Sequence, residues 1–287
     1  MKDPIPSLLV LVMVTLAPSI YAWGDMGHQT IAYIASNFVT SATKNYCQSV
    51  LDDTSTAYLA NAATWADTYR YTSAGAFSKP FHFIDANDSP PKTCDVEYSR
   101  DCGDAGCSIS AINNYTNILL SGQDLDSLKF ILHFVGDIHQ PLHDEALEYG
   151  CNDVDVTFNG DSTNLHHIWD TEILTKLAGG TTISTALAWS KTLTTSIQTG
   201  AYADDAAAWI ADLDISDPVT SATSWASEAN AYVCSEVLAK GLTYIEDEDL
   251  AGAYYTTAVP VVQIQIARAG YRLAAWLNLI VTGSTGL

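Results

Sequence analysis

The distribution of histidine constrains this chain more than any other feature of its sequence. All seven histidines of the 287 residues lie between His28 and His167, and the last 120 residues contain none. Two of them have an aspartate four positions later, in the pairs His133–Asp137 and His166–Asp170. On an α-helix this spacing puts both side chains on one face, one turn apart. Imidazole nitrogen and carboxylate oxygen bind zinc at about 2.0–2.2 Å. One such pair is common as a surface ion pair, but two with His143 between them indicate a metal centre.

The spacing alone leaves two choices of ligand open. His139 and His143 are also four residues apart, but Pro141 lies between them and should end or bend the helix. Either histidine could therefore be the ligand. The neighbours His166 and His167 pose the same choice, although the offset to Asp170 favours His166.

The remaining pattern predicts one mainly helical domain. Apolar residues recur at helical spacing in 31–38, 125–135 and 264–279. Val154, Val156 and Phe158 alternate with polar residues before Asn159-Gly160, which predicts a short strand entering a tight turn. Proline and glycine are frequent in 75–91 and 103–106, and both segments are predicted to be loops. We expect a single domain over 23–287 with one small β-hairpin.

The first 22 residues read as a signal peptide. Lys2 precedes an apolar run over 8–16, and a stretch of small and polar residues leads to Ala22. Cleavage after Ala22 would make Trp23 the first residue of the mature chain. The apolar run is too short for a comfortable membrane span, and no other segment predicts an anchor. The sequence therefore predicts an extracellular protein that does not reside in a membrane.

Six cysteines suit that compartment, where disulfide pairing is the default. Cys102 and Cys107 are close enough in sequence, with glycines between them, to form a local disulfide. Asn87 and Asn114 begin glycosylation sequons, and Pro90 after the first sequon weakens it.

The formal net charge is −21. A chain this acidic does not bind nucleic acid through a basic surface, because phosphate binding normally uses Lys and Arg. If it handles phosphates, it needs another source of positive charge, and bound metal ions would supply it.

The motifs around these residues resemble the S1/P1 nuclease family. They are Trp23-Gly-Asp-Met-Gly-His28, Trp65-Ala-Asp67, Phe81-His82-Phe83-Ile84-Asp85, His133-Phe-Val-Gly-Asp137-Ile-His-Gln-Pro-Leu-His143, Asn164-Leu-His166-His-Ile-Trp-Asp170 and the Ala-Gly-Tyr-Arg-Leu-Ala segment at 269–274. Their order and number extend the resemblance over the whole mature chain. It implies a helical domain of the zinc-dependent phospholipase C/P1 nuclease type.

The resemblance also implies three zinc ions and assigns their ligands. The first ion would be held by Asp67, His82, His133 and Asp137, and the second by His143, His166 and Asp170. The third would be held by His28, Asp137 and the free amine and carbonyl oxygen of Trp23, so that Asp137 bridges two ions. This assignment decides both open choices and leaves His139 and His167 for supporting or structural roles. It further implies a Cys94–Cys234 disulfide, with Cys47 and Cys151 unassigned.

The implied activity is hydrolysis of phosphodiester bonds in single-stranded DNA and RNA, with 5′-phosphate products, and of 3′-nucleotides. Asp67 stands where the family's water-activating carboxylate lies, and Arg70 replaces a family lysine that touches the phosphate. Phe83 would stack on the base, and Asp85 and Asn152 would be its polar partners. Without the resemblance, Phe83 would be interpreted as an aromatic residue of the core. A base reaches such a pocket only when it is unpaired, so single strands should be preferred. The expected protein is a secreted monomer.

Two other classes compete with this reading. A zinc phospholipase C uses a similar N-terminal tryptophan and His/Asp set, but Phe83 and Asp85 suit a nucleobase and no lipid-binding appendage is visible. A zinc-binding glycoprotein without activity is the second alternative. Every expected ligand position is filled, Asp67 included, and this favours an enzyme.

Overall fold

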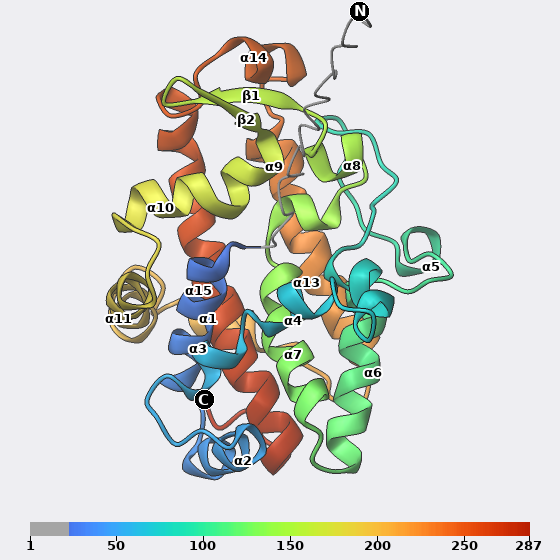
Figure 1. The fold of residues 1–287 in the computed structure, drawn as a ribbon, viewed down its shortest axis with the longest axis vertical. Coiled ribbons are helices and arrows are strands. Elements are labelled where there is room, and N and C mark those ends of the chain that lie inside the picture. Colours follow the sequence, from blue (N-terminus) through green and yellow to red (C-terminus); the bar gives the residue numbers. More distant parts are fainter. Residues whose placement is uncertain (1–22) are drawn as a thin grey trace, which may run out of the picture.

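The computed structural model describes residues 23–287, so the predicted signal peptide at 1–22 lies outside the described residues. The chain is mainly helical with one two-stranded antiparallel sheet, as predicted (Figure 1). The α-helices are α1 (Asp25–Ser36), α2 (Ser41–Leu51), α3 (Tyr58–Ala62), α4 (Trp65–Tyr69), α5 (Tyr98–Asp101), α6 (Ser108–Ser121), α7 (Leu125–Asp137), α8 (Glu148–Cys151), α9 (Leu165–His167), α10 (Ile173–Ala178), α11 (Ile183–Gln198), α12 (Ala206–Trp209), α13 (Pro218–Tyr232), α14 (Leu242–Asp247) and α15 (Ala253–Thr282). The 3₁₀-helices are η1 (Ala76–His82) and η2 (Pro141–Asp144), the π-helices are η3 (Ile168–Glu172) and η4 (Val233–Val237), and the strands are β1 (Asp155–Phe158) and β2 (Asp161–Asn164).

Helix α15 is the long element against which the others pack. It spans 30 residues, and α1, α7 and α2 lie along it (Figure 1). The contact with α1 is close because position 270 is glycine: a Cβ there would lie 2.5 Å from Cβ of Ile34. Helix α7 lies between α15 and α6, so the segment that carries the first His–Asp pair is surrounded by other helices.

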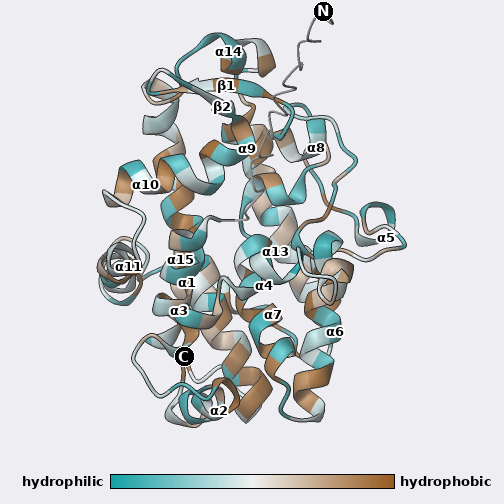
Figure 2. Ribbon diagram, in the orientation of Figure 1, coloured by the Kyte–Doolittle hydropathy of each residue, from teal (hydrophilic) through white to brown (hydrophobic). Residues whose placement is uncertain are grey.

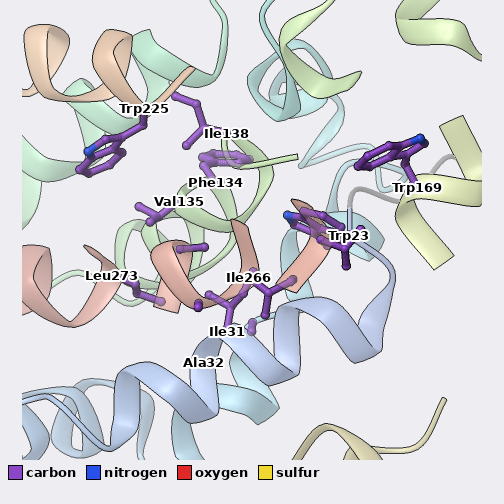
Figure 3. Close-up of a cluster of buried hydrophobic side chains, with 14 of the residues drawn as sticks. Trp23, Ile31, Ala32, Phe134, Val135, Ile138, Trp169, Trp225, Ile266 and Leu273 are labelled. Atoms are coloured by element: carbon purple, nitrogen blue, oxygen red, sulfur yellow. The ribbon is translucent and has the colours of Figure 1, made fainter. Parts of the chain in front are cut away.

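The core is rich in tryptophan. Trp23, Trp169, Trp225 and Trp276 are all fully buried, and Figure 3 shows three of them around Ile31, Phe134 and Ile266. Figure 2 shows hydrophobic and hydrophilic residues alternating along helices such as α6 and α10, as expected for helices with one buried face. Within 23–287, no helix has the length and hydrophobicity that a membrane crossing requires.

The hairpin forms where the alternating pattern predicts it. Residues pair in the register Asp155↔Asn164 to Phe158↔Asp161. The two turn residues have left-handed backbone angles, with φ of 54° at Asn159 and 84° at Gly160. The carboxylate of Asp249 accepts the backbone N–H groups of both turn residues, which attaches the turn to the segment before α15.

Two features of the connecting segments bear on the predictions. The segment expected to be a loop at 75–91 contains the 3₁₀-helix η1, which ends at His82. The disulfides Cys94–Cys234 and Cys102–Cys107 are both present, and Cys47 and Cys151 are buried free thiols.

Candidate metal centre

Eight buried histidines and aspartates from different parts of the chain converge in the interior. They are His28 on α1, Asp67 on α4, His82 at the end of η1, His133 and Asp137 on α7, His143 on η2, His166 on α9 and Asp170 on η3. None is more than 5% exposed. Figure 1 shows α4 and α7 near the centre of the molecule and α9 above them.

The predicted i, i+4 pairs do share a face. His133 Nε2 lies 3.2 Å from Asp137 Oδ2, and His166 Nε2 lies 3.2 Å from Asp170 Oδ2. A third histidine reaches α7 because residue 136 is glycine. A Cβ at Gly136 would lie 2.8 Å from Nδ1 of His28, whose ring stacks on that of His133 with centroids 3.9 Å apart.

Backbone carbonyls orient three of the imidazoles. Nδ1 of His133 donates to the carbonyl of Ala63 at 2.7 Å, and Nδ1 of His143 donates to that of His82 at 2.7 Å. Nδ1 of His166 donates to the carbonyl of Gly150 at 2.6 Å. When such a ring is neutral, its other nitrogen carries a lone pair, so each Nε2 can act as an acceptor directed into the cluster.

The first group contains Asp67, His82, His133 and Asp137. The distance from His82 Nδ1 to His133 Nε2 is 3.1 Å, and from the same Nδ1 to Asp137 Oδ2 is 3.1 Å. Asp67 Oδ1 lies 3.7 Å from His82 Nδ1 and 3.6 Å from His133 Nε2. A tetrahedral zinc ion with ligands at about 2.0–2.1 Å separates its ligand atoms by about 3.3 Å.

The second group contains His143, His166 and Asp170. The two Nε2 atoms lie 3.2 Å apart, and Asp170 Oδ1 is 3.6 Å from that of His143. Gln140 supports this group from outside, because its amide donates to Asp170 Oδ1 at 2.7 Å. Two imidazole lone pairs that face each other at 3.2 Å repel unless a cation or a proton lies between them.

Asp137 connects the first group to a third position. While its Oδ2 faces His82 and His133, its Oδ1 lies 3.1 Å from Nε2 of His28. Both ring nitrogens of His28, both carboxylate oxygens of Asp67 and Oδ1 of Asp137 are buried without a hydrogen-bond partner. Buried polar atoms are nearly always satisfied, and a bound ion is one explanation for exceptions. The donor set, the spacing and these unsatisfied atoms all fit metal ions.

The electrostatics of the groups are dominated by burial, which disfavours every charged form. Burial lowers the pKa of His82 to about 4. Against the effect of burial, Asp137 and Asp67 raise the pKa of His133 to about 10. Burial also opposes the charge of Asp137, but His133 holds the pKa of that carboxyl well below its usual range. The carboxylates therefore stay ionised and attract cations into the interior.

The structure separates the histidines that spacing could not distinguish. His139 points away from the groups: its Nδ1 donates to Val135 O at 2.7 Å, and its Nε2 lies 3.0 Å from a guanidinium nitrogen of Arg272. His167 lies 3.4 Å from Glu172 with a side chain 40% exposed. His143 and His166 occupy the second group, as the resemblance implied.

Trp23 lies close to these groups in the fold. Its side chain is fully buried, and the next residue, Gly24, donates its N–H to the carbonyl of Asp170 at 2.8 Å. Gly24 is small enough for this contact, since a Cβ there would lie 2.9 Å from Oγ1 of Thr171. The start of the described chain is thus attached to a residue of the second group.

A cavity of about 490 Å³ opens over the first and second groups. All four predicted substrate residues line it together with His82, His143 and His166; they are Arg70, Phe83, Asp85 and Asn152. Arg70 is 6% exposed, and its guanidinium lies 3.3 Å from Asp67 and stacks over the Tyr71 ring at 5.2 Å. Partial burial raises the pKa of Asp85, and Asp101 adds to the effect.

The sequence does not single out several residues of the site, including Gln140, Gly136 and the cavity-lining residues Tyr71, Lys79 and Tyr149. Gln140 and Gly136 carry no pattern of their own, although both lie inside the segment that contains the first His–Asp pair. Tyr149 lines the cavity and is 78% exposed. A tyrosine between Glu148 and Gly150 gives no periodic signal, so nothing short of the geometry could have identified it.

A buried His/Asp centre of this kind within a helical domain defines a class of metal-dependent protein, and comparison with known proteins identifies the family. The sequence model of the S1/P1 nuclease family matches residues 23–282. The chain belongs to the S1/P1 nuclease family, which has the all-α fold of the zinc phospholipase C type.

Individual relatives cover nearly the whole chain. It is 56% identical to nuclease S1 of Aspergillus oryzae over 96% of its length and 99% of that protein. It is 48% identical to nuclease P1 of Penicillium citrinum over 90% of its length and 97% of that protein. Endonuclease 2 of Arabidopsis thaliana is more distant, at 30% identity over 95% of this chain and 97% of that one.

Proposed function

We propose that this chain is a zinc-dependent endonuclease that hydrolyses single-stranded DNA and RNA to 5′-phosphate products and also removes phosphate from 3′-nucleotides. The facing Nε2 lone pairs of His143 and His166, 3.2 Å apart and each fixed by a carbonyl behind it, carry the proposal. A cation or a proton between the two nitrogens relieves their repulsion, and a metal ion is the cation that this donor set suits. The cavity above the pair is lined by groups that suit a nucleotide. The nuclease names of the relatives agree with this activity.

Three zinc ions are proposed, with nine ligand residues. Asp67, His82, His133 and Asp137 would hold the first ion, and His143, His166 and Asp170 the second. His28, Asp137 and the amine and carbonyl of Trp23 would hold the third. Bound zinc supplies a water of lowered pKa as the nucleophile and positive charge at the phosphate.

The chain's own residues would orient the reaction. Asp67, which lies beside Arg70 and His82, would accept the proton of the attacking water. Arg70 would bind a phosphate oxygen; its fork of N–H donors differs from the point charge of a lysine in reach and geometry.

The other end of the cavity would bind the base. The Phe83 ring offers a stacking face, and the carboxylate of Asp85 accepts base N–H groups. The amide nitrogen of Asn152 donates to the carbonyl of Tyr149 at 2.7 Å, which leaves its oxygen to accept from the base. Because a paired base cannot enter such a pocket, single strands are the proposed substrates.

The proposed location is extracellular, after removal of residues 1–22. Two disulfides suit an oxidising compartment. The sequon residues Asn87 and Asn114 are both exposed, as glycan attachment requires. We further propose that the chain acts as a monomer.

Metal analysis and substrate digestion test the proposal together. Purified protein that begins at Trp23 should contain three zinc ions and cleave single-stranded DNA and RNA much faster than duplex DNA. Removal of zinc by a chelator should abolish cleavage and lower the melting temperature, and added zinc should restore both. One zinc ion or none in active protein would refute the three-ion site. Equal cleavage of single and double strands would refute the base pocket, and hydrolysis of phosphatidylcholine alone would establish a phospholipase C.

A further inference from the structure

A run of unusual backbone lies at the mouth of the cavity. The four residues of α8 all have left-handed φ and so do not form a regular α-helix: φ is 47° at Glu148, 57° at Tyr149, 65° at Gly150 and 61° at Cys151. Only one of them is glycine, the residue that adopts this conformation without cost. Strained backbone persists where the surroundings fix it, and it clusters at functional sites.

Hydrogen bonds attach this run to the metal centre. The carbonyl of Gly150 accepts from Nδ1 of His166 at 2.6 Å, so a proposed zinc ligand holds the middle of the run. The carbonyl of Tyr149 accepts from the Asn152 side chain at 2.7 Å. A Cβ at Gly150 would lie 2.7 Å from the carbonyl of Leu142, so the run also packs closely against η2. The position of Tyr149 relative to the metal centre is therefore fixed.

The side chain of Tyr149 is exposed although its backbone is fixed. It is 78% exposed, more than any other exposed large hydrophobic side chain among residues 23–287, and it lines the same cavity as Phe83, Asp85 and Asn152. Within the described residues its ring makes no aromatic contact that would explain its placement as packing, whereas Phe77, also exposed, packs against Tyr69, Phe81 and Phe130. A large ring held in solvent at the mouth of a binding cavity has its apolar faces free for a ligand.

We propose that Tyr149 is a second base-stacking residue, which covers a nucleobase held by Phe83 and Asp85 and so favours purine over pyrimidine nucleotides. The inference rests on the proposed function, because it requires a nucleotide in that cavity. Stacking strength grows with the area of the two rings, so a purine gains more from a second ring than a pyrimidine does. The contribution is independent of the phosphate, which the metal ions and Arg70 would bind.

Calorimetric titration of zinc-loaded protein with deoxyadenosine 5′-monophosphate tests the proposal. Loss of a stacking contact weakens binding by roughly 5- to 100-fold, so Tyr149→Ala should raise Kd by a factor in that range. Deoxycytidine 5′-monophosphate should lose less, and ribose 5-phosphate, which has no base, should bind as in the parent protein. Tyr149→Phe keeps the ring and should remain within about twofold of the parent, a difference close to the resolution of such measurements.

Glu148→Ala is the matched control, because Glu148 is exposed and left-handed like Tyr149 but does not line the cavity. It should bind all three ligands as the parent does. Zinc is measured in every variant; if Tyr149→Ala loses zinc, Tyr149→Leu, which keeps an apolar side chain without a ring, decides in its place. The proposal would be overturned if the variant without a ring, Tyr149→Ala or Tyr149→Leu, bound deoxyadenosine 5′-monophosphate with the affinity of the parent. It would also be overturned if that variant lost as much affinity for ribose 5-phosphate as for the nucleotide. If the parent binds none of these nucleotides, the proposed function itself fails.

Discussion

The floor and the mouth of the cavity are built in opposite ways. The eight histidines and aspartates of the floor are at most 5% exposed, and helices or backbone carbonyls hold them from behind. At the mouth, Phe83 is 38% exposed, Tyr71 57% and Tyr149 78%. The floor is therefore set by folding itself, whereas side chains at the mouth can change without disturbing the core. We therefore expect the chemistry to be common to the family and the preference among substrates to depend on the side chains at the mouth.

The strongest way to break the floor is Asp137→Asn. Oδ1 of Asp137 faces His28, and Oδ2 faces the first group. Its negative charge therefore favours a cation at both positions. The amide should lower the zinc content below three and reduce kcat/KM by at least about 100-fold. Elemental analysis and single-strand cleavage measure the two effects. Asp126→Asn, an exposed position on the same helix, should change neither.

Spacing in the sequence indicates, for a physical reason, which residues of the floor are neighbours. A helix repeats its face every three to four residues, so His133 and Asp137 had to be neighbours, and the alternating residues before Asn159-Gly160 had to form a strand and turn. Which of His139 and His143 turns inward could not be predicted from spacing, because Pro141 ends the periodicity. The family resemblance implies His143; in the structure His143 lies beside His166, whereas His139 contacts Arg272.

The mouth was predicted only in part. Phe83 and Asp85 were found through the motif that contains His82, not through any periodic pattern. Tyr149 was missed because its placement depends on left-handed backbone angles and on a hydrogen bond from His166, which are tertiary effects. The 3₁₀-helix η1 is likewise not predicted by the sequence, because Gly75 and Pro80 are typical of turns.

An extra residue before Trp23 tests the proposed role of the Trp23 amine as a zinc ligand. A free α-amine has a pKa near 8 and readily gives its proton to zinc, whereas an amide nitrogen is a very poor ligand. Protein with one additional N-terminal methionine should lose one zinc ion and roughly 10- to 100-fold in activity. The same residue added after Leu287 serves as the control. Equal zinc content and activity in both forms would show that the Trp23 amine is not a ligand.

Gln140→Ala should have a smaller effect, confined to the second group. The Gln140 amide orients Asp170 through a 2.7 Å hydrogen bond without facing the cavity. Loss of such an outer contact typically weakens metal binding by about 10- to 100-fold. Competition with a chelator should therefore remove one zinc ion from the variant at lower chelator concentration than the other two. The control is Gln198→Ala, at the exposed end of α11, which should leave the titration unchanged. A parent-like titration for Gln140→Ala would show that Asp170 does not need the Gln140 hydrogen bond to bind its zinc ion.

The smallest expected effect is at the mouth, where Phe83→Ala should change binding but not the metal centre. Loss of one stacking ring should weaken nucleotide binding by about 10-fold, corresponding to about 1.4 kcal/mol. Zinc content and melting temperature should stay near those of the parent, because Phe83 is 38% exposed and is not a proposed zinc ligand. Phe77→Ala removes another exposed ring, one that does not line the cavity, and should bind nucleotide normally.

The Asp85→Ala variant should resemble Phe83→Ala, since it removes an acceptor for the base and leaves all proposed zinc ligands in place. Full single-strand activity in either cavity variant would show that the base binds elsewhere, and loss of zinc in either would show that floor and mouth are not independent.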